Sequence, residues 1–201
     1  MAKRVAPKMT LAGWLTRARS VRVRNQITAD EAQADYQAII KVVTRRRTLD
    51  WEEAVALLHI VYGLMPTMLR PVLPHTPAQR TQLLANLNNV RSGGILTTAE
   101  LTDVQRFANR SVVGASKLLH VLNPNNYAIW DSRVADAFLW KGVTLAAYST
   151  VARYEQYLDA VRQWAKEAAV KRECAAIREL NPALGDASDL RLIELVLFCK
   201  T

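Results

Sequence analysis

Apolar residues recur at helical spacing along most of the chain, and strand-like alternation is nearly absent. One apolar stripe begins after Asp50 and ends near Gly63, and it comprises Trp51, Ala54, Val55, Leu58 and Val61. Similar patterns predict helices over about 29–47, 83–91, 98–108, 112–122, 131–140, 149–180 and 190–199. The chain is therefore expected to fold as roughly eight helices joined by short loops, which is an all-α class.

Pro, Asn and Gly residues mark the breaks between these helices. Four prolines between residues 65 and 77 exclude a long helix there: Pro66, Pro71, Pro74 and Pro77. The run 123–126, Asn-Pro-Asn-Asn, predicts a second break, and 185–188 a third. Thr28 and Glu31 have the spacing of a capping box, which predicts a helix start at that point.

Basic residues exceed acidic ones and concentrate at the N-terminus. The chain of 201 residues has 27 Lys and Arg against 18 Asp and Glu, a net charge of +9. Residues 1–24 contain no acidic residue and seven basic ones: Lys3, Arg4, Lys8, Arg17, Arg19, Arg22 and Arg24. Unopposed cations are typical of phosphate contacts, so a polyanionic partner is expected and Arg17, Arg19, Arg22 and Arg24 are candidate phosphate contacts. We divide the chain into this basic segment, 1–24, and one helical domain, 25–201.

Several common chemistries have no support in the sequence. The chain has no G-x-G-x-x-G or phosphate-loop motif, and its three histidines, His59, His75 and His120, lack metal-site spacing. Neither a cofactor nor a metal is therefore expected. No apolar run reaches the roughly 18 residues of a membrane span. Two cysteines and no signal-peptide pattern favour a reducing cytoplasm.

Residues 111–134 are the most informative stretch: Ser-Val-Val-Gly-Ala-Ser-Lys-Leu-Leu-His-Val-Leu-Asn-Pro-Asn-Asn-Tyr-Ala-Ile-Trp-Asp-Ser-Arg-Val. Gly114 permits a tight turn or a close backbone approach before a helix, and Lys117 with the first amides of that helix is suited to hold a phosphate. Asp131 directly precedes another helix. It is either a simple N-cap or a carboxylate facing positive charge in a substrate, and the residues alone favour the cap.

This stretch resembles the helix-hairpin-helix superfamily of DNA glycosylases. In that superfamily a Gly-x-Gly-x-Lys-like hairpin grips DNA phosphate, and a segment like Val-Asp-Thr-His-Val supplies a catalytic Asp. Gly114 and Lys117 look like the hairpin residues, and 129–134 looks like the catalytic segment, so the resemblance implies that Asp131 is catalytic. It also implies a two-lobed, all-helical, glycosylase-like bundle. The chain departs from the pattern in three ways: the hairpin has one Gly instead of two, iron-sulfur cysteines are absent, and the lyase lysine has no clear equivalent.

The resemblance also implies roles for residues around Asp131. Arg133 is a candidate phosphate contact or a partner of Asp131. Tyr127, Trp130 and His120 are candidate walls of a pocket for an extruded base, although the residues alone favour structural core or loop positions for all three.

Three functions remain open from the sequence. The first is excision of a modified or damaged base by a hydrolase that cleaves the N-glycosidic bond. The second is a phage-type transferase that replaces pyrophosphate on a 5-hydroxymethyl-pyrimidine of DNA with an amine, and it would need a small amine or amino acid as co-substrate. The third is DNA binding without catalysis. The expected location under each is the cytoplasm of a bacterium or of a phage-infected host cell.

Overall fold

The chain folds into helices, and no β-strand occurs in the part that the structure describes. The computed structural model describes residues 8–23, 31–45, 48–63, 65, 76–139 and 144–199. The elements there are α1 (Leu11–Val23), α2 (Glu31–Thr44), α3 (Trp51–Gly63), α4 (Pro77–Arg91), α5 (Thr98–Phe107), α6 (Val112–Leu122), α7 (Ser132–Phe138), α8 (Leu145–Tyr148), α9 (Val151–Trp164), α10 (Ala168–Leu180), a 3₁₀ turn (Pro182–Leu184) and α11 (Asp189–Phe198). The all-α class predicted from the sequence is confirmed.

Local sequence signals set most helix starts. Thr76 and Gln79 form a capping box on α4, and Thr97 and Glu100 form another on α5. In each box the Thr hydroxyl accepts from a first-turn amide while the longer side chain accepts from the cap amide, so two otherwise unpaired donors are satisfied. The capping box expected at Thr28 lies outside the described residues, as do Pro66, Pro71 and Pro74.

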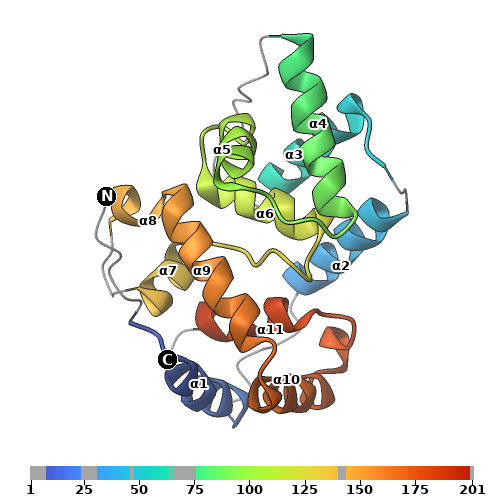
Figure 1. Cartoon of the computed structure of the whole chain (residues 1–201). Helices are drawn as coiled ribbons and strands as arrows, with labels where there is room; N and C mark the ends of the chain where they lie inside the picture. Colours follow the sequence, from blue (N-terminus) through green and yellow to red (C-terminus); the bar gives the residue numbers. More distant parts are fainter. Residues whose placement is uncertain are drawn as a thin grey trace.

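The helices form two groups, joined through α9. α3, α4 and α5 gather around α6 in the upper half of Figure 1, and α2 also contacts α6. α1, α10 and α11 lie side by side at the lower end, where α11 also packs against α7. α9 contacts α5 and α6 on one side and α11 on the other. Residues 111–134 therefore run from the centre of the first group into the second.

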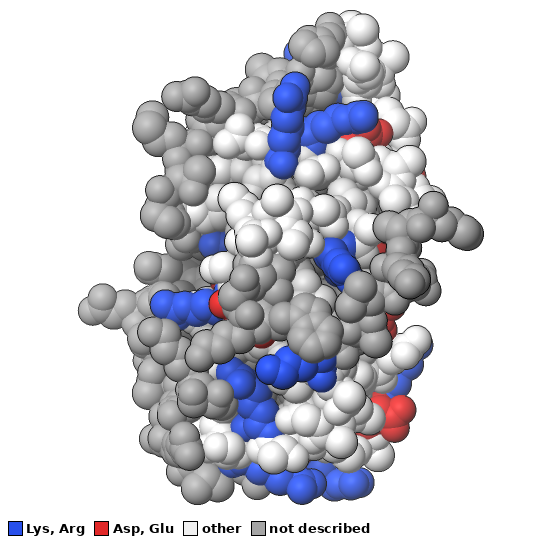
Figure 2. All heavy atoms as spheres, turned by 90° about the vertical axis from the view of Figure 1, so that its left-hand side faces the viewer, with Lys and Arg blue, Asp and Glu red and all other residues white. Residues whose placement is uncertain are grey.

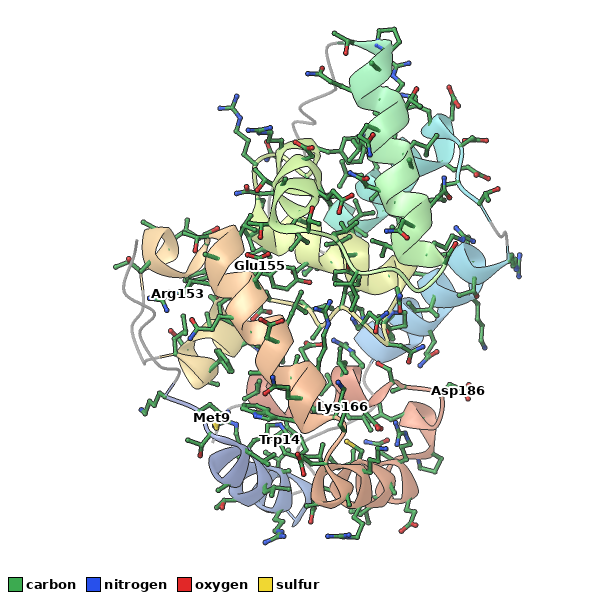
Figure 3. The ribbon with its side chains drawn as sticks, viewed as in Figure 1. Met9, Trp14, Arg153, Glu155, Lys166 and Asp186 are labelled. Atoms are coloured by element: carbon green, nitrogen blue, oxygen red, sulfur yellow. The ribbon has the colours of Figure 1, made fainter. Side chains whose placement is uncertain are left out.

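α1 belongs to the folded core, although the sequence analysis assigned it to a separate basic segment. Trp14 is fully buried, and its indole Nε1 donates to the carbonyl oxygen of Ile193 at 3.2 Å. Figure 3 shows Trp14 between α1 and the C-terminal helices. Ala18 and Val21 are also fully buried. The dense basic charge of this segment concealed a buried face with a period of about one helical turn.

Three further differences separate the observed helices from the predicted ones. α4 begins at Pro77, earlier than the short helix expected around Leu83, because Pro is well suited to the first helical position. The long helix expected over 149–180 is interrupted at Ala165 to Glu167, and α10 then packs against α1 and α11. The short α8 was not predicted.

No helix among the described residues is long and apolar enough to cross a membrane.

Gly114 generates a test of the packing around α6. A Cβ atom added at Gly114 would lie 2.5 Å from the hydroxyl oxygen of Tyr62, whose ring is held because that hydroxyl donates to the carbonyl oxygen of Ala108 at 2.9 Å. We expect Gly114→Ala to lower the free energy of unfolding by about 1–3 kcal/mol through overpacking. Urea denaturation followed by circular dichroism measures this change.

Gly63 provides the matched control for that test. It is the last residue of α3, and an added Cβ would meet nothing within 4 Å. Gly63→Ala is therefore expected to leave stability unchanged or raise it slightly. Equal stability losses at both glycines would contradict the close approach of Tyr62 to α6.

Candidate active site

The site begins at the connection between α5 and α6, which is a tight turn built without glycine. Asn109 and Arg110 both have a φ of 56°, in the left-handed region. The hydroxyl of Ser111 then caps α6 by accepting from the amide of Gly114 at 3.1 Å. Gly114 itself lies inside α6, so its place in the turn, expected from the resemblance, is wrong. The close approach that glycine permits is made to Tyr62 instead.

Asp131 caps α7 and keeps part of its carboxylate open. Its Oδ1 accepts from the amide of Val134 at 2.9 Å, and its carbonyl oxygen accepts from the amide of Ala135 at 2.8 Å. The N-cap interpretation is thereby confirmed. The side chain is only half-buried, and among the described residues Oδ2 accepts no hydrogen bond. A carboxylate fixed by one oxygen can present the other to a substrate.

The structure brings Lys117 close to Asp131. Lys117 lies on α6, one turn after the helix start, and is half-buried. Burial lowers the pKa of its ammonium group, whereas the carboxylates of Asp131 and Glu194 raise it and the Arg191 guanidinium lowers it. Two residues that the sequence analysis singled out separately, 14 positions apart, therefore share one electrostatic environment.

A buried ion pair on α11 lies beside Lys117 and was missed by the sequence analysis. Nη1 of Arg191 donates to Oε2 of Glu194, and the Glu194 side chain is 3% exposed. Burial raises the pKa of Glu194 to about 7; the Arg191 guanidinium acts in the opposite direction, and the Asp131 carboxylate raises it further. One signal could have revealed the pair: opposite charges at positions i and i+3 interrupt an otherwise apolar helix.

Two tyrosines complete this polar cluster. The guanidinium of Arg191 lies over the ring of Tyr36 on α2, 4.6 Å from its centroid. The hydroxyl of Tyr157 on α9 is buried without a hydrogen-bond partner among the described residues. Burial raises the pKa of Tyr157, and the carboxylates of Glu194 and Asp131 raise it further. Ionisable groups from four helices, α2, α6, α9 and α11, thus gather near the start of α7, a concentration typical of functional sites.

The three residues expected to line a base pocket are all buried. His120 lies between the Tyr36 hydroxyl, 2.7 Å from its Nε2, and the Tyr127 carbonyl oxygen, 2.6 Å from its Nδ1. Trp130 donates from Nε1 to the carbonyl oxygen of Tyr148 at 3.0 Å. The Tyr127 hydroxyl accepts from the amide of Leu96 at 2.8 Å. These hydrogen bonds hold the loop before α7. His120 and Trp130 are therefore structural core residues.

The candidate phosphate contacts have different surroundings. Arg17 donates to the carbonyl oxygens of Val196 and Leu197 at the end of α11, and Arg19 pairs with Glu173 at 3.1 Å. Arg133 is exposed and lies over the ring of Phe198, not on Asp131. The side chain of Arg22 and all of Arg24 lie outside the described residues. Figure 2 shows basic side chains from top to bottom of one face, with fewer acidic ones among them.

Comparisons with known protein families, with curated proteins and with solved structures give no match to this chain. Among the described residues, no group of three or more His, Cys, Asp or Glu side chains is placed to hold a metal ion. The site therefore has to be interpreted from its own geometry.

The buried histidine generates a prediction about pH. Burial and the Arg191 guanidinium lower the pKa of His120 to about 3, against about 6.5 in an unfolded chain. The folded state thus binds fewer protons, so the stability that His120 contributes is complete above about pH 6.5 and is lost as the pH falls toward 3. We expect the stability advantage of the wild type over His120→Gln to shrink across this range, by at most about 1.4 kcal/mol per pH unit.

Chemical denaturation of both proteins at several pH values measures this advantage. A difference between wild type and variant that stays constant or grows on acidification would show that His120 is charged in the folded protein.

Proposed function

We propose that the chain is a DNA-base-acting enzyme of the helix-hairpin-helix glycosylase type, which extrudes a modified or damaged base and cleaves its N-glycosidic bond. The observation that carries this proposal is the electrostatic interaction of the Asp131 carboxylate with the Lys117 ammonium group. The partly exposed carboxylate at the start of α7 shares its electrostatic environment with the amine from the helix that follows the α5–α6 turn.

The arrangement of the helices supports the proposal. A helix, a tight turn and a second helix precede a loop that ends in the capping Asp131. Under this proposal, the two groups of helices, around α6 and around α11, would form the two lobes of such a bundle. The net charge of +9 and the exposed guanidinium of Arg133 favour a polyanionic partner.

The proposed reaction places the developing charge next to Asp131. Extruding a base from the stack costs a few kcal/mol, which phosphate contacts offset. When the bond between the sugar and the base breaks, its electron pair leaves with the base and positive charge develops on the deoxyribose. The Asp131 carboxylate stabilises this charge and orients the water that adds to the sugar, as carboxylates do in glycoside hydrolysis.

The protonation state of the Lys117 amine distinguishes two forms of this reaction. A protonated amine beside Asp131 serves as a cation for DNA phosphate and leaves the reaction hydrolytic. A neutral amine, which burial of Lys117 favours, can attack the sugar carbon itself and form an imine with it. Borohydride reduces such an imine to a stable bond, so a covalent protein–DNA adduct that Lys117→Met abolishes would assign the second form.

The transferase alternative uses the same site differently. Asp131 would take a proton from an incoming amine, while Lys117 and Arg133 would hold the departing pyrophosphate. The product distinguishes the two reactions, since excision leaves a free base and an abasic site. Transfer leaves an intact strand with a heavier nucleoside.

Asp131→Asn tests whether the carboxylate is catalytic. Asn is as good an N-cap as Asp, so α7 should form and the fold should persist. We expect base release from DNA carrying uracil, oxidised, alkylated or 5-modified bases to fall by about 100-fold or more, with DNA affinity changed little. Single-turnover assays with electrophoretic detection of abasic sites measure the first quantity, and fluorescence anisotropy measures the second.

Asp136→Asn is the matched control, because Asp136 is an exposed carboxylate on the same helix. It should retain full activity. Full base release by Asp131→Asn, or equal losses in both variants, would contradict the assignment. Wild-type protein that binds DNA but changes no base would leave only the non-catalytic alternative.

A further inference from the structure

A second potential site lies in a cleft between α5, α8 and α9. Its volume is about 510 Å³, within the range of small-molecule sites, and neither Asp131 nor Lys117 lines it. Figure 3 marks two of its residues, Arg153 and Glu155, on the half of α9 nearest α8. The cleft is therefore distinct from the Asp131–Lys117 site.

One part of the cleft is apolar. Leu96, Leu101 and Leu158 line it with side chains of the core, and the ring of Tyr127 lies alongside them. Ile95 stands at the same cleft with 56% of its surface exposed, which makes it one of the few large apolar side chains left open to solvent among the described residues. This part can cover an apolar group of several carbon atoms.

Acidic and basic side chains line the rest of the cleft. Asp159 is exposed and makes no ion pair among the described residues. Glu155 accepts from the hydroxyl of Thr98 at 2.7 Å and is not ion-paired there either. Arg162 donates from Nε to the carbonyl oxygen of Asn126 at 2.7 Å and lies 5.1 Å from the centroid of the Tyr127 ring. Its Nη2 is buried without a hydrogen-bond partner among the described residues.

The spacing along α9 puts opposite charges next to each other. Asp159 and Arg162 are three positions apart, so they are neighbours on the helix surface with Cβ atoms about 5–6 Å apart. They are not joined as an ion pair, although residues at this spacing readily form one. A ligand with a cation and an anion separated by two bonds fits beside such a pair and satisfies both side chains.

We propose that this cleft binds a small zwitterion with a large apolar side chain, namely a free α-amino acid of the phenylalanine or leucine type. The ammonium group lies against Asp159, the carboxylate against the guanidinium of Arg162, and the side chain against Leu96, Leu101 and Leu158. Binding at this cleft is independent of the reaction at Asp131.

Isothermal titration calorimetry with four probes tests the proposal: phenylalanine, phenethylamine, 3-phenylpropanoate and glycine. Phenethylamine lacks the carboxylate, 3-phenylpropanoate lacks the ammonium group, and glycine lacks the apolar side chain. We expect phenylalanine to bind best and each of the others at least about 10-fold more weakly, because each loses one charge-assisted hydrogen bond or the apolar contact. Equal affinities for all four probes, or no binding of phenylalanine, would overturn the proposal.

Asp159→Asn and Asp186→Asn provide matched variants of the whole chain. Both side chains are exposed, and Asp186 does not line the cleft. We expect Asp159→Asn to weaken phenylalanine binding about 10-fold and Asp186→Asn to leave it unchanged. Equal affinities of the two variants for phenylalanine would exclude Asp159 from the site. The titration uses no DNA, so its outcome is separate from that of the base-release assay.

Discussion

A single hydrogen bond, from the amide of Val134 to Oδ1 of Asp131, orients the carboxylate on which the proposed function depends. It fixes the carboxylate at the positive end of α7 and leaves Oδ2 without a hydrogen bond among the described residues. The structural and the functional interpretations of Asp131 are therefore compatible. A cap that uses one oxygen orients the other, and preorganised charge of this kind stabilises a transition state without reorganising.

The ion pair behind Asp131 strengthens this interpretation. Removing Arg191 and Glu194 from water costs several kcal/mol, and a buried pair seldom repays that cost in stability. The nearby Tyr157 hydroxyl, buried and without a partner among the described residues, adds to the cost. The half-buried Lys117 experiences the carboxylates of both Glu194 and Asp131. Such an arrangement is expected where the protonation states of neighbouring groups serve a reaction.

The all-α class and the positions of most helices were predictable because local signals determine them. Apolar stripes, together with Asp50 and Asp131, marked helix starts that the structure confirms. Tertiary contacts decided the rest. The break at Ala165 has no Gly or Pro to announce it, and α10 needs it in order to reach α1. The basic charge of α1 concealed its buried Trp14, because a composition count does not distinguish the two faces of a helix.

The candidate site was only partly predictable. Asp131 and Lys117 stood out because they lie in one unusual stretch of sequence, and the structure brings them together. Arg191 and Glu194 escaped notice because they lie some 60 positions away along the chain, and only tertiary packing brings α11 beside α6 and α7. Gly114 was assigned to the wrong local structure, since a glycine in the first turn of a helix can serve a close tyrosine contact as well as a turn.

The central claim is that Asp131 acts on a nucleotide, and its most direct test is mass spectrometry of the products released from DNA by the wild-type protein. Duplexes carrying uracil or oxidised, alkylated or 5-modified bases serve as substrates. We expect one of them to yield a free base and an abasic site. A heavier nucleoside in an intact strand would reassign the chemistry to group transfer, and nucleosides unchanged in every substrate would contradict the claim.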